Sequence, residues 1–238
     1  KAEYAVAEAL TRLQSDHGVS RSSIFLATKV GNYRHPKEGS QLSAFRRKWS
    51  GSHYCFDPDY IEFSINQSIE ALSVDALDCV FLHNPEVVLK EHGAHITDLM
   101  EEIAPVFETF CNDGKLRYWG ISSWNGFTGT RQSVDHLDLL QILNYLKDKG
   151  KLQHFRILQS PFGFWNFQSY LTENQRGERE ETLSFLEFCA HNDLVFFSNS
   201  PLLQGDVLSN AKGIDEFVNN GRHLTAAQKH LEFVRNFS

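Results

Sequence analysis

The stretch Asp78-Cys79-Val80-Phe81-Leu82-His83-Asn84-Pro85-Glu86 decides how the fold of this chain is read. Its first half has the apolar character of a strand, and His83 follows at the point where that strand stops. Pro85 then sets a turn, because its ring fixes the backbone and removes an N–H donor. A histidine at the carboxyl end of a strand lies where α/β proteins carry out their chemistry.

Similar apolar runs recur along the chain, and from the second run onward one long helical pattern separates each run from the next. This alternation predicts parallel strands joined by helical crossovers. The runs are continuous, as expected for strands that are covered on both faces. The predicted strands are Ile24 to Thr28, Cys79 to Leu82, Leu116 to Ser122, Phe155 to Gln159 and Leu194 to Ser198. The predicted helices are Ala2 to Arg12, Pro58 to Leu72, Leu99 to Phe110, Leu137 to Lys149, Arg179 to His191 and Thr225 to Val234.

Two α/β architectures fit this alternation: a (β/α) barrel and an open doubly wound sheet. No Gly-x-Gly-x-x-Gly follows any predicted strand, which removes the best signal of an open dinucleotide-binding sheet. One segment, Gly31 to Phe56, interrupts the regular spacing between the first strand and its helix. A loop of that length inside a compact domain is usually functional or disordered. Because it follows a strand, we expect it to lie over the candidate site.

The composition is that of one globular domain. The chain has 238 residues, of which 41% are hydrophobic, and a formal net charge of −7. We therefore expect a single domain over residues 1–238 and neither a nucleic acid nor a membrane as partner. Its four cysteines form no Cys-x-x-Cys pair, which indicates free thiols in a reducing compartment and a cytoplasmic location. The His and Cys spacings match no structural zinc site, so we expect no metal.

Polar residues gather at the ends of the predicted strands. In a parallel barrel these ends converge on one face, so residues that are distant in sequence become neighbours. Histidine beside lysine favours proton transfer or carbonyl polarisation. The alternatives are a lysine that leaves a buried strand for water and a satisfied core histidine. The strand-end residues are Lys29, His83, Ser122, Ser123, Gln159, Asn199 and Ser200.

Four motifs resemble those of the aldo-keto reductases in their order and spacing, and the resemblance covers nearly the whole chain. They are Thr28-Lys29-Val30, the stretch Gln67 to Glu86, Gly114-Lys115-Leu116-Arg117-Tyr118-Trp119-Gly120-Ile121-Ser122, and Ser200-Pro201-Leu202-Leu203-Gln204-Gly205. Three local forms are similar to a less studied branch of that superfamily. They are Leu82-His83-Asn84-Pro85-Glu86, Trp124-Asn125-Gly126-Phe127 and Gln159-Ser160-Pro161-Phe162.

The resemblance implies a (β/α)8 TIM barrel that reduces an aldehyde or ketone to an alcohol with NADPH, or runs the reverse reaction. It places Lys29 and His83 in the catalytic group, where a tyrosine protonates the carbonyl oxygen and a histidine orients it. It also implies that Trp124 contacts the small-molecule carbonyl substrate, whereas Asn199 stands where many members have an aromatic ring. The residues that it implies for binding NADPH are Ser122, Ser123, Gln159, Ser200, Leu202, Gln204 and Gly205.

The same resemblance implies that part of the barrel lies outside this sequence. The family's tyrosine and aspartate would precede Lys1, and the segment that grips the adenosine 2′-phosphate would follow Ser238. Tyr4 lies inside a predicted helix and is not taken as the acid. We therefore expect an incomplete domain with about strands three to seven of eight. The alternatives are a non-catalytic relative that senses a nucleotide or binds a protein, and an inactive fragment.

Overall fold

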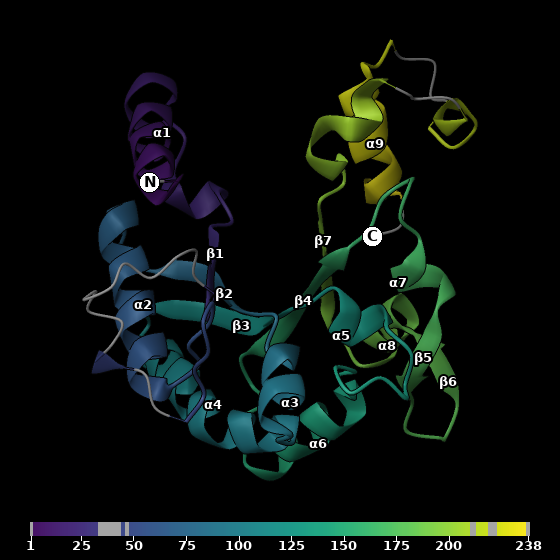
Figure 1. The fold of residues 1–238 in the computed structure, drawn as a ribbon. Helices are drawn as coiled ribbons and strands as arrows, with labels where there is room; N and C mark the ends of the chain where they lie inside the picture. The colour runs from purple at the N-terminus through teal and green to yellow at the C-terminus, as the bar shows by residue number, and fades with distance from the viewer. Residues whose placement is uncertain (1, 33–43, 46–47, 210–212, 219–222, 237–238) are drawn as a thin grey trace. The chain divides into compact units, whose positions relative to one another are not determined.

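The computed structural model describes residues 2–32, 44–45, 48–209, 213–218 and 223–236, in which helices and strands alternate (Figure 1). The helices are α1 (Ala2–His17), α2 (Pro58–Leu72), α3 (Glu86–His92), α4 (Ile96–Asn112), α5 (Asn125–Thr128), α6 (Leu139–Asp148), α7 (Gln168–Leu171), α8 (Phe185–His191) and α9 (Ala226–Arg235). The strands are β1 (Ala27–Val30), β2 (Leu77–His83), β3 (Leu116–Ser122), β4 (Phe155–Pro161), β5 (Glu173–Arg176), β6 (Thr182–Ser184) and β7 (Val195–Asn199). Short 3-10 helices are η1 (Arg21–Ser23), η3 (Leu203–Ser209) and η4 (Ile214–Glu216).

The predicted parallel strands are confirmed. Strand β1 pairs in parallel with β2, and β2 pairs in parallel with β3, within the sheet order β1-β2-β3-β4-β7. In this register Lys29 lies opposite Phe81, and His83 lies opposite Ser122. Helix α2 packs on β1 and α4 packs on β3, so the crossovers cover the sheet. This is the alternation of strands and helices of a TIM barrel.

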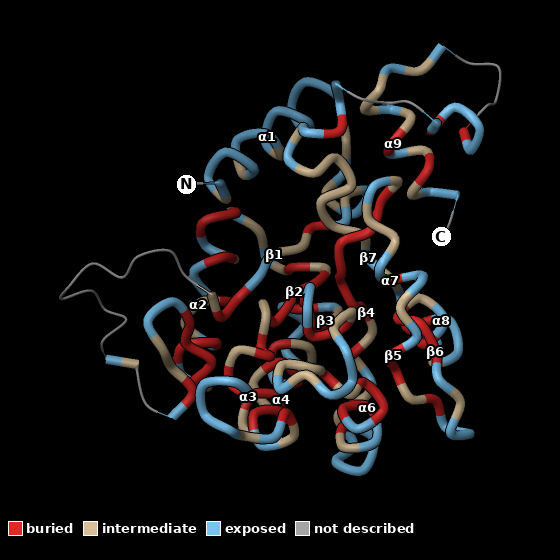
Figure 2. Tube along the Cα trace, turned by 45° about the vertical axis from the view of Figure 1, so that its right-hand side comes forward, coloured by how far each residue is buried: buried red, intermediate tan, exposed pale blue. Residues whose placement is uncertain are grey.

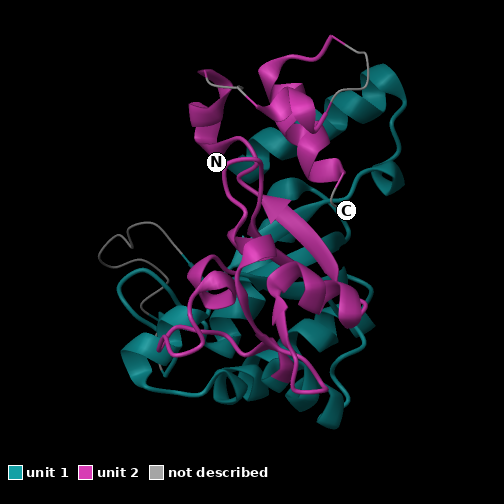
Figure 3. Cartoon of the chain, turned by 90° about the vertical axis from the view of Figure 1, so that its right-hand side faces the viewer, with its two compact units in different colours: residues 1–122, 141–157 teal, residues 123–140, 158–238 magenta. Residues whose placement is uncertain are grey.

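The chain divides into two compact units (Figure 3). Unit 1 consists of residues 1–122 and 141–157, and unit 2 of residues 123–140 and 158–238. The division falls between Ser122 and Ser123, so the two serines at the end of β3 belong to different units.

Unit 1 buries both faces of its central strands, as the red segments of β2 and β3 show in Figure 2. On one face, Cys79 and Phe81 of β2 cluster with Ile157 of β4. In β3, Trp119 stacks on Phe107 of α4, with 4.7 Å between the ring centroids. Burying one large apolar side chain stabilises a fold by about 1.5–3 kcal/mol, so these contacts hold the strands firmly in register.

A buried carboxylate in α4 reinforces this packing. Glu108 Oε1 accepts a hydrogen bond from Trp119 Nε1 at 2.8 Å, and Glu108 Oε2 lies 2.7 Å from His154 Nδ1. Leaving this buried carboxylate without one of its partners would reduce the free energy of unfolding by about 1–3 kcal/mol. The two contacts of Glu108 therefore fix α4 against β3 and the residue that precedes β4.

The first strand begins later than the sequence predicts. The backbone before it is held by side chains: Arg21 donates to the carbonyl oxygen of Ile24 at 2.6 Å, and Asp78 accepts from the N–H of Leu26 at 2.9 Å. Strand β1 therefore spans Ala27–Val30, and Lys29 lies inside it rather than after its end.

Strand β7 is not covered on both faces, in contrast to the prediction from its continuous apolar run. Val195 keeps 54% of its surface exposed and Phe197 keeps 37%. Strand β7 also stands last in the order of the sheet.

Unit 2 shows that the predicted helix from Arg179 to His191 is wrong in its first half. Residues Thr182–Ser184 form β6, which pairs antiparallel with β5. Helix α8 begins only at Phe185, because Ser184 Oγ accepts from the N–H of Glu187 and the Glu187 carboxylate accepts from the N–H of Ser184. This reciprocal capping box starts the helix at Phe185, six residues after the predicted start at Arg179.

Part of the predicted loop from Gly31 to Phe56 lies outside the described residues. The part that the structure describes is packed at its two ends. Asn32 forms an isolated antiparallel bridge with Tyr54, and the Tyr54 hydroxyl donates to Glu91 of α3 at 2.7 Å. The same hydroxyl lies 2.8 Å from His92 Nε2, so α3 anchors the base of this loop.

Gly120 of β3 is the described glycine at which an added Cβ atom would make the closest contact. A Cβ atom at this position would lie 1.6 Å from the carbonyl oxygen of Ile157, so Gly120→Ala should force β3 away from β4. We expect a loss of more than about 3 kcal/mol in the free energy of unfolding, measured by urea denaturation. Gly150→Ala is the matched control, because a Cβ there meets no atom within 4 Å and incurs only the left-handed backbone cost of about 1–2 kcal/mol. Equal losses in the two variants would contradict this account.

Candidate active site

In unit 1, three of the predicted site residues lie together at the carboxyl ends of adjacent strands. Lys29 comes from β1, His83 is the last residue of β2, and Ser122 is the last residue of β3. Lys29 Nζ donates a hydrogen bond to Ser122 Oγ at 3.0 Å. Ser122 is buried, and His83 is half-buried. The parallel register thus brings residues from three distant segments of the chain together in one polar group.

The protonation states of this group follow from its burial. Burial, and to a smaller extent the positive charge of Lys29, lower the pKa of His83 to about 4. Burial also lowers the pKa of Lys29, although this residue remains partly exposed. His83 is therefore a neutral imidazole near pH 7 and can donate a hydrogen bond without carrying charge. A neutral donor beside an ammonium group suits the polarisation of a carbonyl oxygen.

The turn after His83 is more ordered than the sequence indicates. Asn84 adopts a left-handed conformation with φ 54°, and its N–H donates to the carbonyl oxygen of Ser122 at 2.8 Å. Pro85 caps the helix α3, which begins at Glu86 and was not predicted. A non-glycine residue at positive φ is uncommon, and here the hydrogen bond to β3 stabilises it next to His83.

In unit 2, Ser123 and Gln159 are joined through their backbones. Both are buried, and the N–H of Ser123 donates to the carbonyl oxygen of Gln159 at 3.0 Å. Gln159 Oε1 accepts from Asn199 Nδ2 at 3.2 Å, and Asn199 Oδ1 is a buried acceptor without a hydrogen-bond partner among the described residues. Asn199 therefore takes part in a polar pair, a role that its sequence position alone did not reveal.

The segment from Ser200 to Gly205 has an unusual backbone. Four of its residues have positive φ: Ser200 at 52°, Leu203 at 43°, Gln204 at 60° and Gly205 at 105°. Two nested turns shape it, because the N–H of Leu203 donates to Ser200 and the N–H of Gly205 donates to Leu202. Successive backbone N–H groups in turns can form a concave site that binds anions.

Trp124 starts helix α5 in unit 2 and keeps 47% of its surface exposed. The hydroxyl of Ser123 accepts from the N–H of Gly126 at 3.0 Å, so the first turn of α5 is fixed to the serine before it. Asn174 and Gln175 of β5 contact α5 and the segment that follows it, and the sequence carries no signal of these two residues because their partners are backbone groups.

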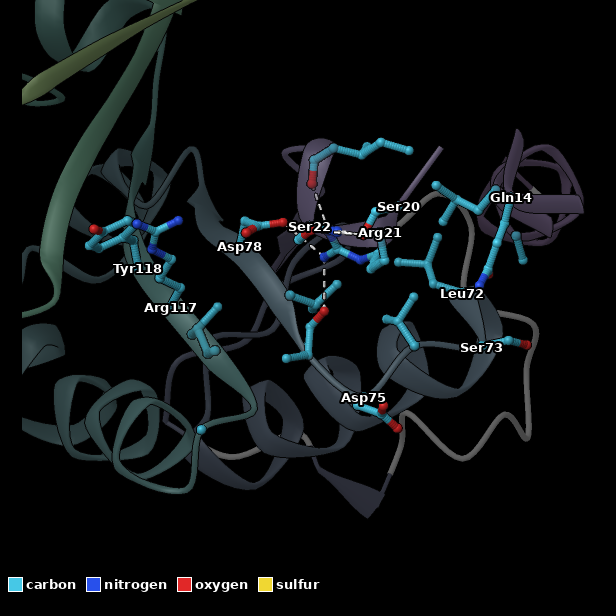
Figure 4. A pocket seen from close by; sticks show the side chains of 18 of the residues that line it. Gln14, Ser20, Arg21, Ser22, Leu72, Ser73, Asp75, Asp78, Arg117 and Tyr118 are labelled. Atoms are coloured by element: carbon cyan, nitrogen blue, oxygen red, sulfur yellow. Dashed lines mark hydrogen bonds and ion pairs between the residues drawn. The ribbon is translucent and has the colours of Figure 1, made fainter. Parts of the chain in front are cut away.

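A cavity of about 990 Å³ in unit 1 lies at the opposite ends of the strands (Figure 4). Its lining includes Leu77 and Asp78 at the start of β2, Leu116 at the start of β3, and residues of α1. Arg21 lies at its centre, where it donates to Asp78 at 2.8 Å. The cavity therefore lies at the ends of the strands away from Lys29 and His83, and its central ion pair is that of Arg21 with Asp78.

No group of three or more His, Cys, Asp or Glu side chains that could hold a metal ion occurs among the described residues. The four cysteines are free. No helix in the described part of the chain is both long and apolar enough to cross a membrane.

The lowered pKa of His83 predicts how the free energy of unfolding changes with pH. Between about pH 6.5 and about pH 4 the unfolded chain binds the proton that folded His83 does not, so stability falls as the pH falls through this window. Urea midpoints at about pH 7.5 and about pH 5 should therefore differ less in His83→Gln than in the wild-type protein.

His17→Gln is the matched control, because it removes an exposed imidazole from the end of α1. This variant should follow the wild-type protein, as His136 and His230 contribute equally to all three proteins. If the urea midpoint fell equally in the wild-type protein and in His83→Gln between the two pH values, burial would not suppress the protonation of His83.

Comparison with known proteins identifies the family. A model of the aldo/keto reductase family matches residues 1–237. The chain is 23% identical over 197 residues to the aldo-keto reductase yakc of Schizosaccharomyces pombe, whose name specifies NADP(+), over 83% of this chain and 44% of that protein. It is 29% identical over 150 residues to the L-galactose dehydrogenase of Arabidopsis thaliana, over 56% of this chain and 40% of that protein. The chain thus spans less than half the length of these two relatives.

Solved structures show the same fold. An aldo-keto reductase from Bacillus halodurans superposes with a TM-score of 0.53 at 19% identity, over 97% of this chain and 62% of that one. The aldose reductase from Schistosoma japonicum gives a TM-score of 0.54 at 17% identity, over 96% of this chain and 62% of that one. Together with the family match over residues 1–237, these likenesses show that the chain belongs to the aldo/keto reductase family.

Proposed function

We propose that this protein reduces an aldehyde or ketone to the alcohol with NADPH, or catalyses the reverse oxidation. The observation that carries the proposal is the group formed by Lys29, His83 and Ser122 at the ends of three adjacent parallel strands. Its ammonium and neutral imidazole are the donors that a carbonyl oxygen needs while negative charge develops on it. Membership of the aldo/keto reductase family supports the same chemistry.

In this proposal the three residues have separate tasks. His83 donates a hydrogen bond to the substrate carbonyl and orients it, which its neutral state permits at pH 7. Lys29 lowers the pKa of the acid that protonates the carbonyl oxygen, which in this family is a tyrosine. Ser122 accepts from Lys29 at 3.0 Å and so holds the ammonium group in place.

The residues of unit 2 fit a nicotinamide cofactor. A carboxamide offers N–H donors, and Asn199 Oδ1 is a buried acceptor without a partner beside Gln159. We propose that Ser123 and Gln159 hold the carboxamide and that Ser200, Leu202, Gln204 and Gly205 hold the pyrophosphate through their backbone. When bound, the cofactor supplies a hydride from C4 of its nicotinamide ring. The phosphorylated form is favoured by the name of the fission-yeast relative.

The remaining features complete the proposal. Residues 1–238 would belong to one oxidoreductase domain. Trp124 would contact a small-molecule substrate through its exposed ring. The free, buried thiols of Cys55, Cys79 and Cys189 are compatible with action in the reducing cytoplasm.

His83→Ala tests the proposal by activity. Loss of an orienting donor should reduce kcat/KM for a panel of aldehydes by about 10²-fold to 10⁴-fold, because such groups act mainly in the transition state. NADPH oxidation at 340 nm measures the rate, and fluorescence titration measures NADPH affinity. The affinity should change little, because His83 is outside the proposed cofactor group.

His17→Ala provides the control, since it removes a solvent-exposed histidine of α1 and should keep wild-type activity. If His83→Ala reduced every aldehyde as fast as the wild-type protein, the role of His83 would have to be abandoned. If the wild-type chain bound NADPH but reduced none of the aldehydes, the proposed reaction would give way to the two alternatives, a non-catalytic relative and an inactive fragment.

A further inference from the structure

Helix α5 depends on other parts of unit 2 for its position. It has four residues, Asn125–Thr128, and so short a helix has no stability of its own in water. It nevertheless carries Trp124 at its start and is fixed there to Ser123 through the N–H of Gly126. The carbonyl groups at its other end require partners, because Phe127 is buried.

Asn174 of β5 supplies those partners. Its Nδ2 group donates to the carbonyl oxygen of Phe127 at 2.9 Å and also to the carbonyl oxygen of Gly129. Asn174 is 3% exposed, so both hydrogen bonds are shielded from water. One amide thus satisfies two carbonyl groups where α5 ends.

Gln175 extends this contact to the far end of the same segment. Its Nε2 donates to the carbonyl oxygen of Phe127 at 3.2 Å, and its Oε1 accepts from the N–H of Leu139 at 3.2 Å. Gln175 is fully buried. The two amides therefore bind both ends of residues 127–139 to the hairpin of β5 and β6. The Phe127 ring also stacks on Phe185, with 4.6 Å between the ring centroids.

We propose that Asn174 is a positioning residue that fixes α5, and through it Trp124, so that it determines which carbonyl compounds the protein accepts. The proposal rests on the proposed function, since it assigns Trp124 to the substrate. Asn174 acts by donating alone, because its Oδ1 has no hydrogen-bond partner among the described residues. A backbone held by two buried hydrogen bonds presents its aromatic side chain in one orientation, whereas a free loop would present many.

Asn174→Asp is the sharpest variant, because the carboxylate keeps the shape of the amide but turns an acceptor toward two carbonyl oxygens. Asn192→Asp is its matched control. Asn192 also donates through Nδ2 to a backbone carbonyl, that of Phe188 at 2.8 Å, but it does so at the end of α8.

The first measurement is independent of activity. Hydrogen exchange followed by mass spectrometry should show faster exchange in the peptide covering residues 123–139 for Asn174→Asp, by at least about tenfold, and no change there for Asn192→Asp. Unchanged exchange in Asn174→Asp would overturn the proposal, because the amide would then not hold the segment.

The second measurement tests specificity. The ratio of kcat/KM for a bulky aromatic aldehyde to that for a short aliphatic aldehyde should shift at least about tenfold in Asn174→Asp. General loss of folded protein lowers both rates equally and leaves the ratio unchanged. In a Trp124→Ala background the same substitution should shift the ratio no further, because its effect passes through the indole ring.

The outcomes of the second measurement separate two failures. A constant ratio together with faster exchange would overturn the specificity role of Asn174 while leaving the proposed function intact. If the wild-type protein reduced no carbonyl compound, the proposed function and the specificity role would fail together. The exchange result would then still report whether Asn174 holds α5.

Discussion

The parallel register of β1, β2 and β3 is the constraint on which the candidate site depends. It places Lys29 opposite Phe81 and His83 opposite Ser122, so that the ammonium group of Lys29 reaches the hydroxyl of Ser122 at 3.0 Å. A slip of one residue in a strand would turn every side chain to the other face. The packing of Trp119 on Phe107, and the close approach of Gly120 to the backbone of Ile157, oppose such a slip.

The burial that fixes this register also sets the chemistry. Packing removes water from His83, and the nearby ammonium group of Lys29 adds to the effect, so the imidazole stays neutral at pH 7. The same environment weakens the fold in acid, because His83 binds a proton more readily in the unfolded chain than in the folded one. The burial of His83 lowers the free energy of unfolding in acid. A histidine kept at this position despite that cost is more consistent with selection for function than with selection for stability alone.

The sequence predicted the elements whose signals are local. Helix α2 has the predicted bounds Pro58–Leu72, because Asp57 and Pro58 mark its start and its apolar residues recur on one face. Strand β3 likewise has its predicted bounds Leu116–Ser122. The resemblance to the aldo-keto reductases was predicted from motifs and is confirmed by the match over residues 1–237.

What the sequence could not predict depends on distant partners. Thr182–Ser184 is a strand only because β5 pairs with it, and no periodicity within the segment reveals that partner. The start of β1 depends on a hydrogen bond from Leu26 to Asp78 across the sheet. The contacts of Asn174 are made to backbone carbonyls, which any residue type provides, so the sequence carries no sign of them.

Transfer of isotope tests the central claim most directly. NADPH that carries deuterium at C4 of the nicotinamide would be incubated with the protein and an aldehyde, and the alcohol analysed by mass spectrometry. The account predicts that the alcohol carries one deuterium atom on the former carbonyl carbon. It also predicts that Lys29→Met forms this alcohol at least about 10²-fold more slowly than the wild-type protein. Alcohol without deuterium, or deuterium transfer at an equal rate by Lys29→Met, would contradict it.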